Sequence, residues 1–142
     1  MTRFTRSLLA AATTFSFSAI ALAADDTIRI GFYCPLTGGS ADMGVSARNG
    51  IRLAFEEING MAGGVNGRKL ELVERDHLAN PEHAKKVVEE LIQKEKVVAT
   101  MGVCNTGVGL ATIDAFQTAK VPLIVPVSTG TPLTKKFAGA PE

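Results

Sequence analysis

The stretch "VVATMGVCNTGVGLA", Val97 to Ala111, joins a continuous apolar run to a small polar cluster and then to a segment with helical apolar spacing. An apolar run of this kind is typical of a strand that is covered on both faces of a parallel sheet. The cluster that ends it, Asn105-Thr106-Gly107, holds an amide, a hydroxyl and a glycine. Such an ending is either an ordinary polar turn or a binding edge whose backbone N–H groups need free access.

From Thr27 onward, segments with strand-like apolar patterns alternate with segments that have helical apolar spacing. Strands are predicted at residues 27–33, 69–75, 97–103 and 121–127, and helices at residues 45–59, 81–96 and 107–119. In the first helix, one face carries Ile51, Ala54, Phe55 and Ile58. Alternating strands and helices predict an α/β fold with a doubly wound parallel sheet and right-handed crossovers.

The N-terminal segment has the three parts of a secretory signal peptide. Arg3 and Arg6 supply a positive region, an apolar stretch follows, and Ala21-Leu22-Ala23 matches a small-residue cleavage site. Cleavage after Ala23, or one residue later, leaves residues 24–142 as the mature, exported chain. The alternative is a membrane anchor, but the apolar stretch is short for a spanning helix and no stop-transfer pattern follows it.

Composition sets broad limits on function. Hydrophobic residues make up 46% of the chain and charged residues 20%, which is typical of a globular protein. The formal net charge is +1, and without the signal peptide 13 basic residues face 14 acidic ones. A chain this close to neutral, with no basic face, is not expected to bind nucleic acid.

In a doubly wound sheet, ligands bind outside the carboxyl ends of the strands. At these ends the chain carries "YCPLTGG", "RDHLAN", "CNTG" and "PVSTGTP". Gly107 and Gly109 open a helix whose first N–H groups have no intrahelical partner and attract anions, and the Thr106 hydroxyl can also donate. Alternatively, Asn105 or Thr106 is simply the N-cap of that helix, and the two interpretations are compatible.

An ordered series of segments carries a family resemblance: "IRIGFYCPLTG", "GIRLAFEEIN", "GGVNGRKLELVERD", "NPEHA", "VVATMGV" and "VPLIVPVSTGTPLT". Together they resemble the start of a type I periplasmic binding protein of the leucine/isoleucine/valine-binding group, the substrate-binding component of ABC importers. The resemblance runs from about Thr27 to the end of the chain. It implies two lobes that close on a small ligand like a hinged clamp, with residues 24–142 forming a partial N-terminal lobe and the second lobe absent.

The resemblance also implies ligand-binding residues. Thr106 and Thr129 would donate hydroxyl and N–H groups to a ligand carboxylate, and the Val127 carbonyl would accept from an ammonium group. Asn105 and Ser128 adjoin these positions and complete the predicted edge. For Thr129 the alternative is turn chemistry, since "STGTP" is rich in turn-forming residues.

Met43 stands where the family often places an aromatic ring over the ligand. A methionine can pack on an apolar ligand or can simply pack its own helix. This departure from the family pattern leaves the ligand open among leucine-like amino acids, short amides, urea and aromatic acids.

The two cysteines, Cys34 and Cys104, follow the first and third predicted strands. In a 2-1-3-4 strand order these strands are neighbours about 4.8 Å apart, and an exported chain can form a disulfide. Two free thiols are the alternative, because side-chain direction can forbid the bridge. The bridge known in the family has its first cysteine near residues 78–80, where this chain has none.

No catalytic or metal-binding constellation is visible in the sequence. Asp76, His77, Glu82 and His83 lack a compact metal-ligand spacing, "GGVNGR" is not a phosphate loop, and Ser128 is not in a nucleophile elbow. We therefore expect neither enzyme activity nor a cofactor or metal.

The expected function is an extracytoplasmic solute-binding component, located in the periplasm and monomeric when complete. It would deliver a small carboxylate- or amide-bearing ligand to an inner-membrane ABC permease. Two alternatives are a ligand-sensing receptor domain of the same fold and an exported α/β enzyme, for which Cys104 is the candidate nucleophile.

Overall fold

The computed structural model of the chain describes residues 27–136, so the predicted signal peptide lies outside the described residues. The strands are β1 (Thr27–Cys34), β2 (Lys69–Asp76), β3 (Ala99–Gly102) and β4 (Leu123–Ile124). The helices are α1 (Ala41–Met61), α2 (Pro81–Glu89), the π-helical turn η1 (Glu90–Lys94), α3 (Thr106–Ala119) and α4 (Thr131–Lys135).

All strand pairs are parallel, and the sheet has the order β2-β1-β3-β4. The central strand β1 pairs with β2 from Thr27 opposite Lys69 to Cys34 opposite Asp76. On its other side it pairs with β3, with Ile30 opposite Ala99. This arrangement confirms the α/β class and the parallel sheet predicted from the alternating periods.

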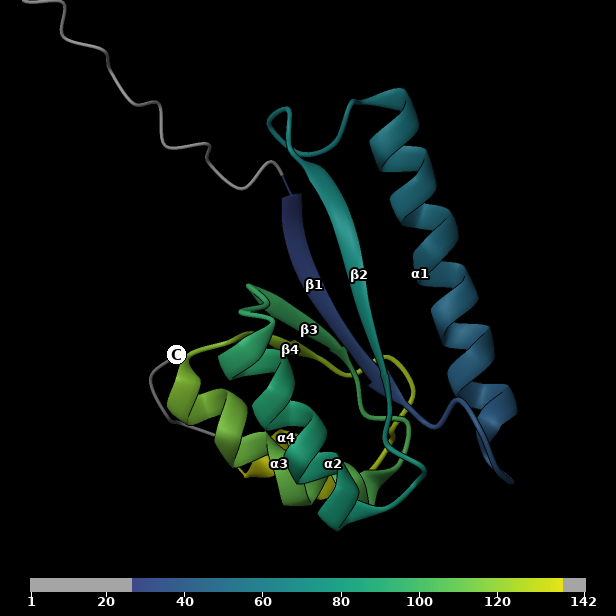
Figure 1. The fold of residues 1–142 in the computed structure, drawn as a ribbon. Coiled ribbons are helices and arrows are strands. Elements are labelled where there is room, and N and C mark those ends of the chain that lie inside the picture. The colour runs from purple at the N-terminus through teal and green to yellow at the C-terminus, as the bar shows by residue number, and fades with distance from the viewer. Residues whose placement is uncertain (1–26, 137–142) are drawn as a thin grey trace, which may run out of the picture.

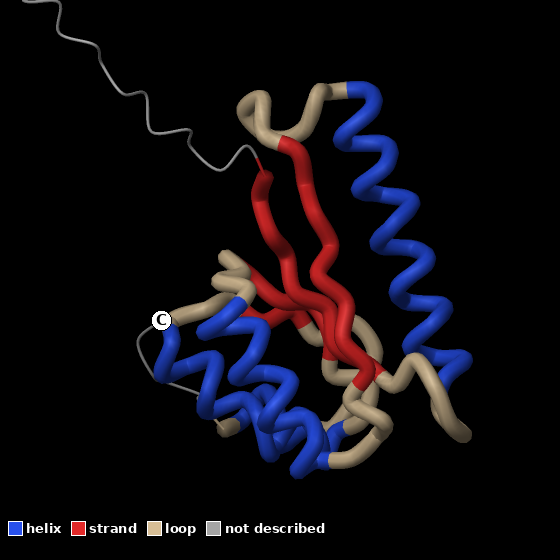
Figure 2. The backbone as a smooth tube through the Cα atoms, viewed as in Figure 1, coloured by secondary structure: helices blue, strands red, loops and turns tan. Residues whose placement is uncertain are grey.

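The sheet has helices on both faces, as the ribbon and the tube show (Figures 1 and 2). Successive β1 residues point to opposite faces, so Phe32 and Tyr33 lie in different cores. Tyr33 packs in the larger core with residues of α2 and α3, and its hydroxyl lies 3.0 Å from the Thr112 hydroxyl. Phe32 packs on the other face with the two cysteines and with Ile51 of α1.

The fourth strand is shorter than predicted. Residues 121–127 were expected to form it, but only Leu123 and Ile124 pair with β3. The physical reason is in the sequence: Pro122 and Pro126 flank this pair, and proline has no N–H to donate to a sheet. The segment after Ile124 is therefore free to turn across the carboxyl end of β3.

The predicted helix at residues 81–96 begins correctly but does not stay α-helical. Asn80 caps it, because its side-chain oxygen accepts from the N–H groups of Glu82 and His83, and Pro81 occupies the first turn. The α-helix ends at Glu89 and continues as η1. Arg75 of β2 contacts Glu90 at 3.0 Å and Glu95 at 2.7 Å, and so ties this widened turn to the sheet.

The apolar face of the first helix is only partly buried. Of its four residues Phe55 is buried, whereas Ala54 is exposed and Ile58 is 37% exposed. The helix lies along β1 and β2, and Asn59 exchanges two hydrogen bonds with the backbone of Leu70. The helix lies beside β1 and β2 (Figure 1), and apolar side chains away from the sheet, such as Leu53, remain in solvent.

Cys34 and Cys104 form a disulfide, with their Cα atoms 5.4 Å apart. Cys34 ends β1, and Cys104 follows β3 by two residues, so the bridge joins two neighbouring strand ends. Both cysteines are buried in the core that contains Phe32. Of the two alternatives that the sequence leaves open, the structure has the bridge.

Removal of this bridge should lower stability. The two cysteines are 70 residues apart, and loop closure in the unfolded chain over such a distance corresponds to about 4 kcal/mol. We expect Cys34→Ala combined with Cys104→Ala to lower the free energy of unfolding by about this amount, measured by urea denaturation without reductant. A loss below about 1 kcal/mol would contradict the expectation.

Candidate functional site

The carboxyl ends of the four strands meet at one edge of the sheet (Figure 1). Four connections leave from this edge: the loops between β1 and α1, β2 and α2, β3 and α3, and β4 and α4. Because the strands are parallel and β1 is central, segments far apart in the sequence become neighbours here. This is the edge at which the sequence places the candidate residues.

Thr106 and Ser128 come together across this edge. Their hydroxyl oxygens are 2.7 Å apart, although the residues are 22 positions apart in the chain. Gly130 packs directly against Thr106, because a Cβ atom at position 130 would collide with the threonine side chain. Thr129 lies between these two contacts and is exposed. The β4–α4 loop therefore lies against the first residue of α3.

Asn105 holds the N-cap position of α3 but does not cap the helix with its side chain. Its backbone is extended, and the Gly109 N–H donates to its carbonyl. The side-chain oxygen of Asn105 is buried and has no hydrogen-bond partner among the described residues. The first-turn N–H groups of α3 thus remain as donors beside the Thr106 hydroxyl, which suits an anionic group.

Val103 is a residue of this edge that the sequence analysis missed. It has a φ of 64°, in the left-handed region that a β-branched residue rarely adopts. Its N–H donates to the Tyr33 carbonyl at 3.2 Å, and its carbonyl accepts from the Ser128 N–H at 3.2 Å. Hydrophobic patterning places Val103 in the core but carries no signal for this backbone conformation.

Asp76, at the end of β2, is a second residue with an unexpected role. Its carboxylate accepts hydrogen bonds from the Leu36 N–H, the Thr37 hydroxyl and the Leu78 N–H. Burial alone raises the pKa of this carboxyl, but the hydrogen bonds outweigh burial and hold the pKa below its usual value. Asp76 therefore fixes the β1–α1 loop as an anion.

The remaining predicted residues are Val127 and Met43. Val127 is half-buried against the core that holds Phe32 and both cysteines. Met43 is in the first turn of α1 and is 40% exposed. The next residue, Gly44, packs so closely on Cys34 and Pro35 that a Cβ atom would collide with the Pro35 carbonyl. The first turn of α1 is thereby held on the same edge of the sheet.

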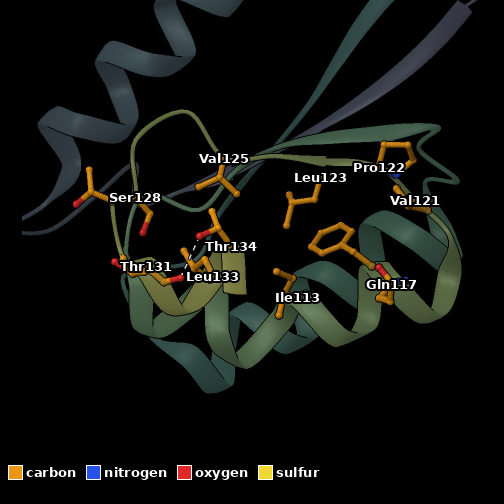
Figure 3. Close-up of a pocket in the computed structure, with 13 residues that line it drawn as sticks. Ile113, Gln117, Val121, Pro122, Leu123, Val125, Ser128, Thr131, Leu133 and Thr134 are labelled. Atoms are coloured by element: carbon orange, nitrogen blue, oxygen red, sulfur yellow. Dashed lines mark hydrogen bonds between the residues drawn. The ribbon is translucent and has the colours of Figure 1, made fainter. Parts of the chain in front are cut away.

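A cavity of about 630 Å³ lies beside this edge, between α3, β4 and α4. Ile113, Leu123 and Leu133 are among the apolar residues that line it (Figure 3). Ser128 and Thr129 also belong to its lining, but Thr106 does not. The cavity is therefore mainly an apolar space between the last elements and touches the predicted polar edge only through the β4–α4 loop.

Among residues 27–136, no three histidine, cysteine or acidic side chains gather closely enough to hold a metal ion. No helix in that range is long and apolar enough to cross a membrane.

Residues 27–139 match the family model described as periplasmic binding protein, and the chain belongs to this family. Among curated relatives, it is 34% identical over 129 residues to the leucine-, isoleucine-, valine-, threonine- and alanine-binding protein of Pseudomonas aeruginosa. That match covers 91% of this chain and 34% of the relative. The chain thus spans about a third of the length of this relative.

Solved structures show the same family resemblance. The chain is similar to the branched-chain amino acid transporter substrate-binding protein LivJ of Streptococcus pneumoniae, solved with isoleucine (TM-score 0.73, 36% identity, 78% of this chain and 31% of the other). It is also similar to an ABC transporter solute-binding protein of Rhodopseudomonas palustris, solved with 3,4-dihydroxybenzoic acid (TM-score 0.70, 33% identity, 78% and 30%). Both are named as substrate- or solute-binding proteins of transporters.

The site edge also contains a buried titratable group, His77, which follows β2. Its Nδ1 accepts from the Ala79 N–H, and its ring packs edge-on against Tyr33. Its Nε2 is buried with no partner among the described residues. Burial lowers the pKa of His77 below its ordinary 6.5, so the folded protein holds this imidazole neutral.

Stability should therefore fall as the pH drops below about 6.5. Below pH 6.5, His77 is protonated in the unfolded chain but stays neutral in the folded chain. This difference lasts until the pH reaches the lower pKa of His77 in the folded state. The slope can reach about 1.4 kcal/mol per pH unit for one proton. Urea denaturation between pH 5 and 7.5 measures it, and His77→Leu should flatten the profile. An equal slope in both proteins would contradict the prediction.

Proposed function

We propose that this chain forms part of the extracytoplasmic solute-binding component of an ABC importer. The ligand would lie against the carboxyl edge of the sheet, in a cleft between this lobe and a second lobe. An inner-membrane permease would receive the ligand from the complete protein. The family membership and the named roles of the relatives support this proposal, and the predicted signal peptide agrees with a periplasmic location.

The single observation that carries the proposal is the arrangement around Thr106. Its hydroxyl lies at the start of α3, where the N-cap side chain leaves the first-turn N–H groups uncapped. The Ser128 hydroxyl is 2.7 Å away, so one of the two hydroxyl protons can be directed at a ligand while the other joins the pair. Hydroxyl and amide donors at a helix N-terminus are suited to a carboxylate.

The proposed ligand class follows from this donor set. A carboxylate is common to isoleucine and to 3,4-dihydroxybenzoic acid, the molecules named with the two similar structures. We assign Thr106 and Thr129 to this carboxylate and the Val127 carbonyl to an ammonium group. An ammonium group distinguishes an amino acid from a benzoate, so the proposed ligand is an amino acid of the branched-chain type, with Met43 beside its apolar body.

The test is a thermal-shift screen of the full-length protein against leucine, isoleucine, valine, 4-hydroxybenzoate, acetamide and urea. A ligand at a hundred times its Kd adds about 2.7 kcal/mol of stability, which gives a visible shift. Thr106→Val removes a hydrogen-bonding hydroxyl but keeps the shape of the side chain. We expect it to weaken carboxylate binding by about 10- to 100-fold, since a hydrogen bond to a charged group contributes roughly 1.5–3 kcal/mol.

Two control variants sharpen this test. Thr106→Ser retains the hydroxyl and should retain binding. Thr118→Val makes the same chemical change at an exposed position of the same helix and should leave binding unaltered. If the protein melts cooperatively and no compound of the panel raises its melting temperature, the proposed ligand class is overturned.

A further inference from the structure

We propose that the Cys34–Cys104 disulfide is a positioning element for the ligand edge, and that it acts by holding Val103 in its left-handed conformation. The effect on backbone geometry follows from the described residues alone. Its consequence for ligand affinity rests on the proposed function.

Val103 adopts a conformation that its own side chain disfavours. At a φ of 64°, the Cβ atom of a non-glycine residue crowds the following carbonyl, and branching at Cβ makes the crowding worse. Such a conformation persists only where the surrounding structure determines it. Something adjacent must therefore oppose relaxation of Val103 to an extended backbone.

The constraint lies on both sides of the residue. Cys104 is covalently bound to Cys34. The residue before Cys34 is Tyr33, and its carbonyl accepts the Val103 N–H at 3.2 Å. The pair 103–104 is thus fastened to the pair 33–34 by one hydrogen bond and one covalent bond. An extended Val103 would carry Cys104 away from Cys34, which the disulfide prevents.

The conformation of Val103 in turn sets the position of two other elements. Its carbonyl accepts the Ser128 N–H at 3.2 Å, which anchors the β4–α4 loop. Its side chain is fully buried and packs on α3 so closely that a Cβ atom at Gly109 would collide with it. Relaxation of Val103 would turn its carbonyl away from Ser128 and free the loop that brings the Ser128 hydroxyl to Thr106.

The disulfide is placed to act as a permanent constraint and not as a redox switch. Cys34 is completely buried and Cys104 is 6% exposed. The first turn of α1 covers the bridge, since Gly44 packs on Cys34 and Pro35. Small thiols have little access to sulfur atoms in such a position.

The test compares two destabilised proteins. The first is Cys34→Ala with Cys104→Ala, which removes the bridge. The second is Leu91→Ala, which removes a fully buried side chain from η1, an element that contributes no residue to the ligand edge. Amide hydrogen exchange, read by NMR for Ser128, measures the bond to Val103, and thermal melting measures global stability.

We expect the Ser128 amide to exchange more than tenfold faster in the cysteine variant than in Leu91→Ala, after both rates are compared at equal distance from their melting temperatures. Equal exchange in the two proteins would overturn the proposal, because the bridge would then act only through global stability.

Val103→Gly completes a double-mutant cycle. Glycine adopts positive φ without steric cost, so removal of the bridge should speed Ser128 exchange much less in this background than in the parent. An undiminished effect overturns the proposal. If the cysteine variant does not fold, Cys34→Val with Cys104→Ala, which refills part of the buried space, takes its place in the same comparison, and Ser128 exchange equal to that of Leu91→Ala likewise overturns the proposal.

Calorimetric titration with L-leucine and 4-hydroxybenzoate separates this proposal from the proposed function. Weaker binding by the cysteine variant than by Leu91→Ala supports positioning of the ligand edge, and equal affinities overturn it. If the parent protein binds neither probe while Ser128 exchange still responds to the bridge, the proposed ligand class fails and the positioning role stands.

Discussion

The structure depends on the parallel pairing of β1 with a strand on each side. Every other element is placed relative to this strand: α1 against one of its faces, α2 and α3 against the other, and the polar loops at its carboxyl end. Tyr33 of β1, for example, contacts residues from several other elements. Its ring contacts His77 and Phe116, its hydroxyl meets Thr112, and burial raises its pKa above the ordinary value.

Ion pairs between oppositely charged side chains reinforce the pairing of β1 with β2. Arg29 of β1 faces Glu71, its register partner on β2, at 3.3 Å, and Arg29 also approaches Glu95 at 3.6 Å. Arg75 of β2 contacts Glu95 as well, so this carboxylate joins two strands to the segment that follows η1. Hydrogen bonding to Arg75 lowers the pKa of Glu90, which keeps its charge in this network. The widened turn after α2 brings Glu90 and Glu95 within reach of one guanidinium.

Much of this fold was predictable because buried parallel strands leave a strong mark in a sequence. The apolar run before Cys104 and the alternation of strand-like and helical patterns were enough to predict the α/β fold class. The 2-1-3-4 strand order, which makes Cys34 and Cys104 neighbours, is the observed one. Where prediction failed, a local effect competed with the pattern. Pro122 and Pro126 cut the last strand to two residues, and α1 buries only part of its expected apolar face.

The candidate edge was predictable in part. The sheet topology places Thr106 and Ser128 at the same edge. Their 2.7 Å contact, however, depends on the path of the β4–α4 loop, which the hydropathy pattern does not encode. The role of Asp76 was missed because its partners are mostly backbone N–H groups, which every residue has. Val103 was missed because side-chain hydrophobicity carries no information on φ.

The span of the disulfide has a further consequence for the order of events during folding. The two cysteines are 70 residues apart, and between them lie α1, β2, α2, η1 and β3. A chain that emerges from its N-terminus exposes Cys34 long before Cys104 appears. The native bridge can close only after β3 has emerged and docked beside β1, and until then the early thiol is open to wrong partners. Native oxidation of this pair therefore follows the docking of β3 beside β1.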